Sequence, residues 1–314
     1  MSNNLHVILG TGPVGCWIAR TLREQNFAVR AVNRSGKRPD LMPADVEIIA
    51  ADVSSAQQAI DAAKGARVVY QALNPPYHKW HEFFPGLQDG ALAAARAAGA
   101  RYVSIENLYM CDSSKPMNEN SPTAPRSKKG ELRSRMADQV MAAQRRAEIQ
   151  ATALRSSDYY GPGVLGSALG EMVFGNLVIG KKAKVGGSAD MPHAFAYIED
   201  VGRAAVILGT REEALGKVWI APHAPARTQR EMIEIACRQL AIKPQLSVVS
   251  PFMMRMAGLF IPGARASVEM MYEFTEPFVV DSNRIQRTFD LEPTPVDTGI
   301  ERTLNWYKKR SGKH

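Results

Sequence analysis

Short apolar segments alternate with longer amphipathic segments through the first half of the chain. Apolar runs rich in β-branched residues predict strands at the positions 7–9, 28–32, 46–50, 67–72, 101–105 and 151–155. An Ala-rich stretch over residues 86–98 and a second polar-apolar stretch over 131–146 predict helices between the later strands. This alternation predicts an α/β fold built on a doubly wound parallel sheet.

The pattern changes after about residue 160. Glycine, proline and methionine become more frequent from Gly161 onward, and the clean alternation is lost. We therefore expect a sheet domain over residues 1–160 and mainly a smaller C-terminal α/β substrate lobe over 161–314. Residues 193–215, which begin with an apolar segment, are predicted to return to the sheet domain.

The first strand leads directly into a glycine-rich turn. The turn reads Gly10-Thr11-Gly12-Pro13-Val14-Gly15, and an amphipathic helix follows it. In this context Gly10 permits a tight turn, Gly12 lets a pyrophosphate approach the backbone, and Gly15 lets the helix pack closely on the strand. The motif predicts a dinucleotide-binding Rossmann domain, and a glycine-rich turn without a ligand is the alternative.

The end of the second strand bears on the choice of cofactor. NAD-binding domains usually place a carboxylate there, which bonds the ribose 2′-hydroxyl and repels a 2′-phosphate. This chain has the neutral Asn33 followed by Arg34, with Lys37 close behind. Because arginine pairs with phosphate, the sequence favours NADP(H) over NAD(H). The alternative is that both cations are solvated loop charges.

The ends of the third and fourth strands supply further cofactor candidates. Asp52 can accept a hydrogen bond from the adenine amino group, and Val53 can pack on the ring. Alternatively, Asp52 caps the next helix. Asn74, between a strand and two prolines, is expected beside the nicotinamide.

Charge and composition narrow the class of protein. The formal net charge is +8, which suits anionic ligands, but no zinc-finger spacing or RNA-binding signature accompanies it. The three cysteines are scattered and give neither a disulfide framework nor a metal site. No run is apolar enough for a membrane span and the N-terminus lacks a signal-peptide pattern, so we expect a cytoplasmic protein with a small-molecule partner and no specific nucleic acid.

Two later segments complete a resemblance. They read Arg155-Ser-Ser-Asp-Tyr-Tyr-Gly-Pro-Gly163 and Ala196-Tyr-Ile-Glu-Asp-Val-Gly-Arg-Ala204. With the glycine turn and Ala51-Asp52-Val53, they make the chain resemble the extended short-chain dehydrogenase/reductases, and most of all their atypical epimerase/dehydratase-like members. The resemblance implies an N-terminal Rossmann domain, a C-terminal substrate lobe and a possible homodimer. The glycine spacing is one residue shorter than is usual in extended members.

The resemblance also implies a Tyr-x-x-x-Lys pair after the fifth strand, where the tyrosine transfers a proton. Here Lys129 falls at the tyrosine position and Arg133 at the lysine position. Lys129 is therefore one candidate proton donor, provided that its surroundings lower its pKa; binding the cofactor or facing solvent are its alternatives. The other catalytic candidates lie on loops that end near the expected cleft: Tyr109, Tyr159, Tyr160 and Tyr77. The alternative for each of them is a place in the wall of the cleft.

Two functions remain open from the sequence. The first is an NADP(H)-dependent oxidoreductase or epimerase-like enzyme that acts on a small carbonyl or hydroxyl compound with a non-standard proton donor. The second is a non-catalytic NADP(H)-binding redox sensor of the nitrogen-metabolite-repression type, which keeps the fold without the tyrosine.

Two further segments allow more than one interpretation. The methionine-rich stretch 251–260 and Met270-Met271 are expected in the core of the C-terminal lobe, or else in the wall of an apolar pocket. His193 is expected either near the substrate pocket or in an exposed loop.

Overall fold

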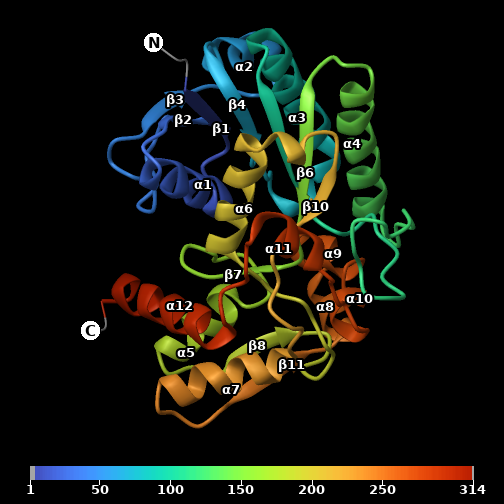
Figure 1. The fold of residues 1–314 in the computed structure, drawn as a ribbon. Coiled ribbons are helices and arrows are strands. Elements are labelled where there is room, and N and C mark those ends of the chain that lie inside the picture. The colour runs from blue at the N-terminus through green and yellow to red at the C-terminus, as the bar shows by residue number, and fades with distance from the viewer. Residues whose placement is uncertain (1–3, 313–314) are drawn as a thin grey trace.

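A seven-stranded parallel sheet forms the centre of the computed structural model, which describes residues 4–312 (Figure 1). Its order is β10-β6-β5-β4-β1-β2-β3, and every pairing between neighbours is parallel. The strands are β1 Leu5–Leu9, β2 Ala28–Asn33, β3 Glu47–Ala50, β4 Ala66–Gln71, β5 Arg101–Glu106, β6 Gln150–Arg155 and β10 Val218–Ile220. The predicted doubly wound α/β sheet is confirmed, with the six predicted strands shifted by two residues at most.

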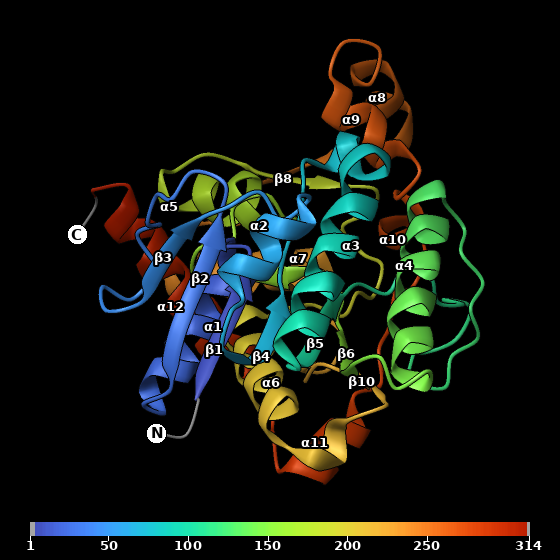
Figure 2. The same cartoon turned by 90° about the horizontal axis from the view of Figure 1, so that it is seen from above.

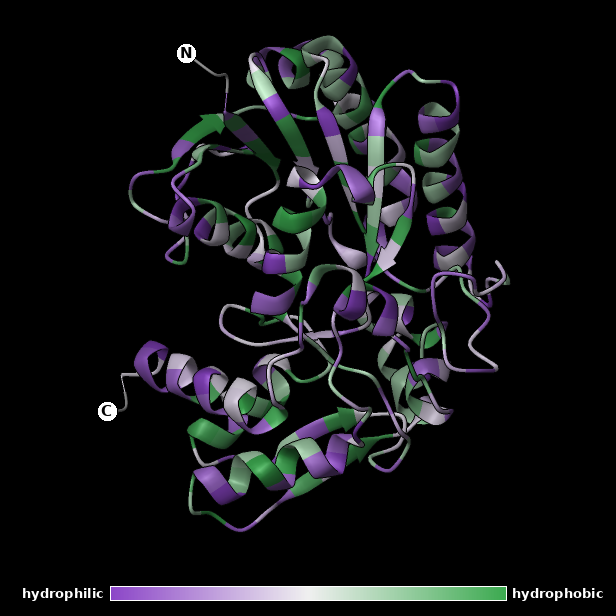
Figure 3. Cartoon of the chain, in the orientation of Figure 1, coloured by the Kyte–Doolittle hydropathy of each residue, from purple (hydrophilic) through white to green (hydrophobic). Residues whose placement is uncertain are grey.

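Helices cover both faces of this sheet (Figure 2). One face carries α1 Pro13–Glu24 and α6 Ile198–Thr210, while the other carries α2 Ala56–Ala62, α3 Trp80–Ala98 and α4 Lys128–Arg145. Strand residues alternate between the two resulting cores: Ile8 faces α1 and α6, whereas Val7 and Leu9 face α2 and α3. Figure 3 shows these strands as largely hydrophobic, which is typical of a sheet buried on both faces.

A second, smaller group of elements lies at the carboxyl ends of the strands (Figure 1). Its core contains Phe174, Val185, Ile233 and Leu304. Its elements are β7 Tyr159–Tyr160, η2 Gly170–Gly175, α5 Asn176–Val178, β8 Ala183–Gly186, β9 Ala196–Tyr197, α7 Gln229–Gln239, β11 Leu246–Val249 and α12 Val296–Arg310. The remaining short helices are η1 Tyr77–Lys79, η3 Glu212–Ala214, α8 Pro251–Ala257, α9 Pro262–Val268, α10 Tyr272–Thr275 and α11 Asn283–Phe289.

The chain crosses between the two groups of elements more than once. Within residues 193–215, β9 is a short strand of the smaller group, and α6 packs on the sheet. Helix α6 packs on α1 so closely that a Cβ on Gly202 would lie 2.9 Å from the backbone carbon of Trp17. Strand β10 then joins the sheet beside β6.

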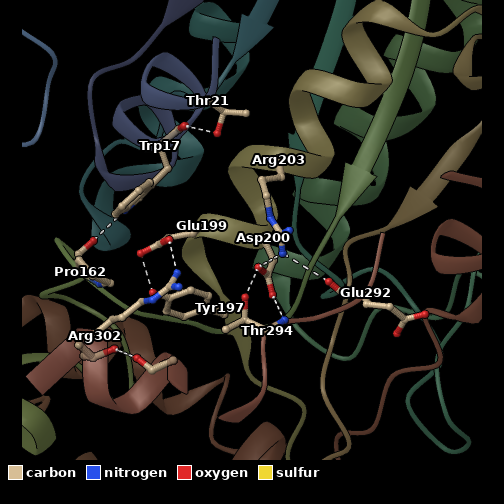
Figure 4. A network of polar contacts seen from close by, with 12 residues as sticks. Trp17, Thr21, Pro162, Tyr197, Glu199, Asp200, Arg203, Glu292, Thr294 and Arg302 are labelled. Atoms are coloured by element: carbon tan, nitrogen blue, oxygen red, sulfur yellow. Dashed lines mark hydrogen bonds and ion pairs between the residues drawn. The ribbon is translucent and has the colours of Figure 1, made fainter. Parts of the chain in front are cut away.

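Polar contacts around the start of α6 tie the two groups together (Figure 4). The buried Asp200 carboxylate accepts hydrogen bonds from the Thr294 backbone at 2.7 Å and from Arg203 at 2.5 Å. Glu199 accepts from Arg302 on α12 at 3.1 Å. The Asp-Val segment that carried the family resemblance therefore acts here as a joint between α6 and the C-terminal elements.

Candidate functional site

The glycine turn between β1 and α1 has a different requirement at each glycine. Gly10 has φ +104°, and a Cβ there would lie 2.6 Å from the carbonyl oxygen of Ala72. A Cβ on Gly15 would lie 2.0 Å from the carbonyl oxygen of Gly10, so the helix touches the turn directly. Nothing lies within 4 Å of a Cβ built on Gly12. The turn is thus tight at both ends and leaves open space at its middle.

Helix α1 begins at the wall of that open space. Gly12 is its N-cap, Pro13 its first residue, and no side chain caps its free amides. These unpaired N–H groups and the helix dipole favour an anion at this position.

An outer cavity of about 330 Å³ runs along the turn and the ends of β2, β3 and β4. Its lining residues are Gly10, Thr11, Gly12, Pro13, Asn33, Arg34, Ala51, Asp52, Val53, Ser54, Ala72, Leu73, Asn74, Pro75, Pro76, Phe83 and Leu87. The structure therefore brings together most of the residues expected at the cofactor. Of the others, Val14 lines a neighbouring cavity, whereas Gly15 contacts the turn.

Asn33 and Arg34 have different roles in the outer cavity. The Asn33 amide donates to the Thr11 hydroxyl and to the Lys37 carbonyl oxygen, both at 2.9 Å. It therefore fastens the loop after β2 to the glycine turn. Arg34 is exposed at the cavity wall, so its guanidinium is available to an anionic ligand.

Asp52 stands at the opposite wall of the outer cavity. Its carboxylate accepts hydrogen bonds from the Ser54 hydroxyl at 2.7 Å and the Ser54 amide at 3.0 Å. These bonds, with the charge of Arg34 nearby, hold the pKa of Asp52 below its ordinary value. The N-cap of α2 is Ser55, so Asp52 shapes the turn before the helix and does not cap it.

An inner cavity of about 310 Å³ continues from the outer one at the ends of β4, β5 and β6. The two share Gly12, Pro13, Ala72, Leu73 and Asn74. The other residues that line the inner cavity are Val14, Tyr77, Trp80, Phe84, Ile105, Glu106, Asn107, Tyr109, Arg133, Ser156, Ser157, Asp158, Tyr159, Val164, Leu165, Gly166 and Ser167. The two cavities therefore adjoin along the shared residues, with Arg34 on the wall of the outer one and three tyrosines on the wall of the inner one.

Two of these tyrosines form a pair. Tyr77 and Tyr109 lie close together, and each hydroxyl shifts the pKa of the other. Burial raises the pKa of both phenols well above their ordinary value, so both are protonated at neutral pH. Trp80 supports the pair, with its ring 4.9 Å from Tyr77 and 6.0 Å from Tyr109 between centroids.

The third cavity tyrosine has another environment. Tyr159 accepts a hydrogen bond from the Ser156 hydroxyl at 2.9 Å. Burial raises the pKa of this phenol as well, while the charge of Arg133 opposes the rise.

Lys129 lies behind the cavity wall and lines neither cavity. Its ammonium group donates to the Glu269 carboxylate at 2.5 Å and to the Ala266 carbonyl oxygen at 2.8 Å. It also lies 4.5 Å from the centre of the Tyr77 ring. The next residue, Gly130, sits so close to the Tyr109 carbonyl oxygen that a Cβ would lie 2.4 Å from it. The first turn of α4 therefore supports the tyrosine pair from behind.

Arg133, one turn further along α4, does line the inner cavity. It is buried, donates to the Ile105 carbonyl oxygen at 3.1 Å and stacks 5.0 Å from the Phe84 ring centre. Its neighbour Glu106, at the end of β5, is paired with Arg155 at 3.0 Å. The carboxylate of Glu106, at the carboxyl end of β5, is therefore already engaged in an ion pair.

An Asp–His pair was missed by the sequence reasoning. Asp158 lines the inner cavity, and its carboxylate lies 2.9 Å from His193 Nε2. His193 Nδ1 lies 3.0 Å from the Glu273 carbonyl oxygen, to which only an N–H can donate. His193 is 1% exposed, so the expectation of an exposed loop is wrong. The pair joins residues 35 positions apart, and only the alternative that placed His193 near the substrate pocket pointed to it.

Glu273 adds an unusual buried carboxyl beside this pair. It is 2% exposed, and its Oε1 has no hydrogen-bond partner within residues 4–312. Burial, with the charge of Asp158 nearby, raises the pKa of Glu273 well above its ordinary value. This buried carboxyl lies close enough to Tyr77 and Tyr109 to raise the pKa of both phenols.

The comparison with protein families agrees with this geometry. Residues 10–159 match the model of the NAD(P)H-binding family. This part of the chain is therefore similar to NAD(P)H-binding domains. The matched range begins at Gly10 and ends at Tyr159, so it spans the glycine turn and the strands whose ends form both cavities. No curated protein matches the chain in sequence.

Solved structures share the fold of the whole chain. A dTDP-glucose 4,6-dehydratase from Bacillus anthracis, in complex with NAD, is 13% identical with a TM-score of 0.80, covering 98% of this chain and 97% of its own. A UDP-glucuronic acid 4-epimerase from Bacillus cereus, with UDP-glucuronic acid and NAD, is 15% identical with a TM-score of 0.77, covering 98% and 99%. An epimerase from Methanothermobacter thermautotrophicus is 15% identical with a TM-score of 0.82, covering 98% and 93%. The chain thus has the fold of the NAD-dependent epimerases and dehydratases, as the resemblance implied.

The residues of the matched region fit a dinucleotide. The open space at Gly12, the uncapped start of α1 and the two adjoining cavities on either side of it match a pyrophosphate with a group at each end. Within residues 4–312 no helix is both long and apolar enough to cross a bilayer.

Proposed function

We propose that the chain is an NADP(H)-dependent oxidoreductase or epimerase-like enzyme that acts on a small carbonyl or hydroxyl compound. The observation that carries this proposal is the shared boundary of the two cavities at Gly12, Pro13 and Asn74. A dinucleotide whose adenosine lies in the outer cavity reaches the inner cavity with its other end. There, protonated tyrosines face the remaining space.

The preference for NADP(H) rests on Arg34. Its guanidinium is exposed at the outer cavity and can pair with a ribose 2′-phosphate. Asn33, which stands where NAD-binding domains place a carboxylate, has its amide group engaged with Thr11 and Lys37. No carboxylate at that position therefore opposes the phosphate.

A bound nicotinamide dinucleotide supplies or accepts a hydride, and the chain's own residues must supply the proton. We propose that Tyr77 gives its hydroxyl proton to the substrate oxygen during carbonyl reduction. Tyr109 lowers the pKa of Tyr77, so we propose that its nearby hydroxyl stabilises the phenolate left behind. The Lys129 ammonium, 4.5 Å from the Tyr77 ring centre, adds a favourable charge. A tyrosine–lysine pair would thus serve the reaction, with the lysine on α4 after the fifth strand and the tyrosine on η1 after the fourth.

With Tyr77 as the proton donor, Lys129 has a different role from the one expected from the sequence. As a proton donor it would have to leave the Glu269 carboxylate and the Ala266 carbonyl oxygen and enter the cavity. We therefore propose Lys129 as a positioning residue for Tyr77. Tyr159 is proposed as a wall residue, since its hydroxyl accepts from Ser156 and lies apart from the pair.

The test is NADPH oxidation, followed by absorbance, with a panel of aldehydes and ketones. Loss of a positioned general acid typically costs about a hundredfold to ten-thousandfold in rate, so Tyr77→Phe should lose at least a hundredfold in kcat. Tyr109→Phe should lose less, and Tyr159→Phe, a matched cavity tyrosine, should stay near wild type. Unchanged turnover in Tyr77→Phe would remove Tyr77 as the donor.

The non-catalytic sensor remains the second candidate. It is favoured by Lys129, which stands at the family's tyrosine position and is held in an ion pair with Glu269. Tight NADPH binding without turnover of any carbonyl compound or alcohol is the result that this alternative predicts.

A further inference from the structure

The hairpin of α8 and α9 exposes an unusual number of apolar side chains. Phe252, Leu259 and Phe260 are 70%, 60% and 85% exposed. Three more large apolar residues between 252 and 261 are also exposed: Met253, Met256 and Ile261. The expectation that the stretch 251–260 lies in a core or lines a pocket is therefore wrong for these side chains, although Met270 and Met271 are buried.

This concentration of exposed apolar side chains is specific to the hairpin. Within residues 4–312, only five other large hydrophobic residues are exposed, and they are spread from residue 165 to residue 248. Single exposed apolar residues are normal on a protein surface, whereas six within ten positions mark an interaction site. Figure 2 shows α8 and α9 projecting from the body of the molecule beyond the start of α3.

The charges on this projection all have one sign. The hairpin, residues 251–268, carries Arg255 and Arg265 and contains no Asp or Glu. Lys243 lies before β11, outside the hairpin, and Glu269 directly after α9 pairs with Lys129. Lys243 and Arg255 form no ion pair within residues 4–312. Exposed aromatic and aliphatic side chains flanked by unpaired cations are the combination that binds the interface of an anionic lipid bilayer.

A second copy of the chain fits this surface less well. A symmetric dimer places the same patch of each subunit against its partner. The two copies would then bring Arg255 and Arg265 of one chain toward the same cations of the other, with no acidic residue of the segment between them. Anionic lipid headgroups supply the missing negative charge.

The root of the hairpin adjoins the inner cavity. Helix α9 packs against η1, whose first residue is Tyr77, and Lys129 bonds the Ala266 carbonyl oxygen and Glu269 just after α9. Much of the cavity wall is apolar, including Trp80, Phe84 and Val164. A bilayer bound at the hairpin would therefore lie near the wall of the substrate site.

We propose that the tip of the α8–α9 hairpin inserts into the interfacial layer of an anionic membrane, without crossing it. The docking follows from the exposed side chains and their charges, and does not depend on any activity. Where the proposed enzyme function also holds, the docking presents the inner cavity to apolar carbonyl or hydroxyl compounds that partition into lipid.

The experiment is flotation of the full chain with vesicles. One set contains phosphatidylcholine alone and the other equal parts of phosphatidylcholine and phosphatidylglycerol. The wild type should float with the anionic vesicles, and added salt should weaken this binding. The double variant Phe252→Ser/Phe260→Ser should lose at least tenfold in the partition coefficient, and Arg255→Ala should lose less.

A matched double variant controls for general loss of surface hydrophobicity. Met172→Ser/Ile179→Ser removes two exposed apolar side chains elsewhere and should float like the wild type. Because all four positions are exposed, both variants should keep the wild-type melting temperature and NADPH affinity. Flotation that persists without NADPH turnover would leave the docking intact and count against the enzyme function alone.

Two results would overturn the docking. One is the absence of flotation with either vesicle composition. The other is a wild type that forms a dimer in solution and does not bind vesicles, together with a Phe252→Ser/Phe260→Ser variant that is monomeric. That result would assign the hairpin to contact with a second copy.

Discussion

Gly12 and Gly15 lie in the same turn, but a methyl group should affect the protein in different ways at the two positions. In the ligand-free protein a Cβ on Gly12 meets nothing within 4 Å, and its φ of −69° suits alanine. Losing glycine as the N-cap costs roughly 0.5–1.5 kcal/mol, and the lower chain entropy of unfolded alanine returns about 0.4–1 kcal/mol. Gly12→Ala should therefore change the free energy of unfolding by less than about 1 kcal/mol.

The same methyl group should weaken dinucleotide binding strongly. It fills the open space at the start of α1, where the pyrophosphate is expected. Displacing the phosphates costs one charge-assisted hydrogen bond from the helix amides, which is about 1.5–3 kcal/mol. At 1.4 kcal/mol for each factor of ten, the Kd for NADPH should rise by about tenfold to a hundredfold.

Gly15→Ala is the matched comparison. Its Cβ would lie 2.0 Å from the Gly10 carbonyl oxygen, so the backbone must move in the free protein. Forced overpacking of this kind costs about 1–3 kcal/mol. Urea unfolding followed by circular dichroism gives the stabilities, and calorimetric titration with NADPH gives the affinities. An unchanged Kd in Gly12→Ala, or a loss of stability as large as that of Gly15→Ala, would refute this account of the turn.

Three further predictions concern charge and protonation. Arg34→Ala should lower the ratio of NADPH to NADH affinity by about tenfold or more, since a charged hydrogen bond is worth about 1.5–3 kcal/mol, and an unaltered ratio would remove the 2′-phosphate assignment. Burial lowers the pKa of His223 to about 4, so as the pH falls this histidine is protonated in the unfolded state before it is protonated in the folded state. The free energy of unfolding should therefore fall by up to roughly 3 kcal/mol as the pH drops from 6.5 to 4. Urea titrations of His223→Asn should show a shallower fall. Burial raises the pKa of Glu273, so stability falls as pH rises above 4.5; Glu273→Gln should melt at a higher temperature than wild type at pH 8 and at a similar one at pH 4, and equal melting at both would count against a buried neutral carboxyl.

The sheet and the glycine turn could be predicted because their signals are local. The apolar runs and the Gly10 to Gly15 spacing each occupy a few consecutive residues, and a parallel sheet requires little else. The same reasoning placed Asn74 and the tyrosine loops at one edge of the sheet, because the carboxyl ends of parallel strands meet there.

The parts of the site that could not be predicted depend on contacts between residues distant in sequence. Lys129 meets Glu269 across a sequence separation of 140, and His193 meets Asp158 across 35. The hydrophobic periodicity of a sequence does not indicate such pairs. The segment 251–260 was misjudged because apolar composition shows that residues avoid water, without showing whether protein or another phase covers them.

A crystal structure with NADPH bound tests the central claim most directly. The account predicts the adenosine ribose phosphate beside Arg34 in the outer cavity, the pyrophosphate over Gly12, and the nicotinamide in the inner cavity with its C4 facing the space beside Tyr77 and Tyr109. A nucleotide bound outside these cavities, or a nicotinamide turned away from the tyrosine pair, would contradict it.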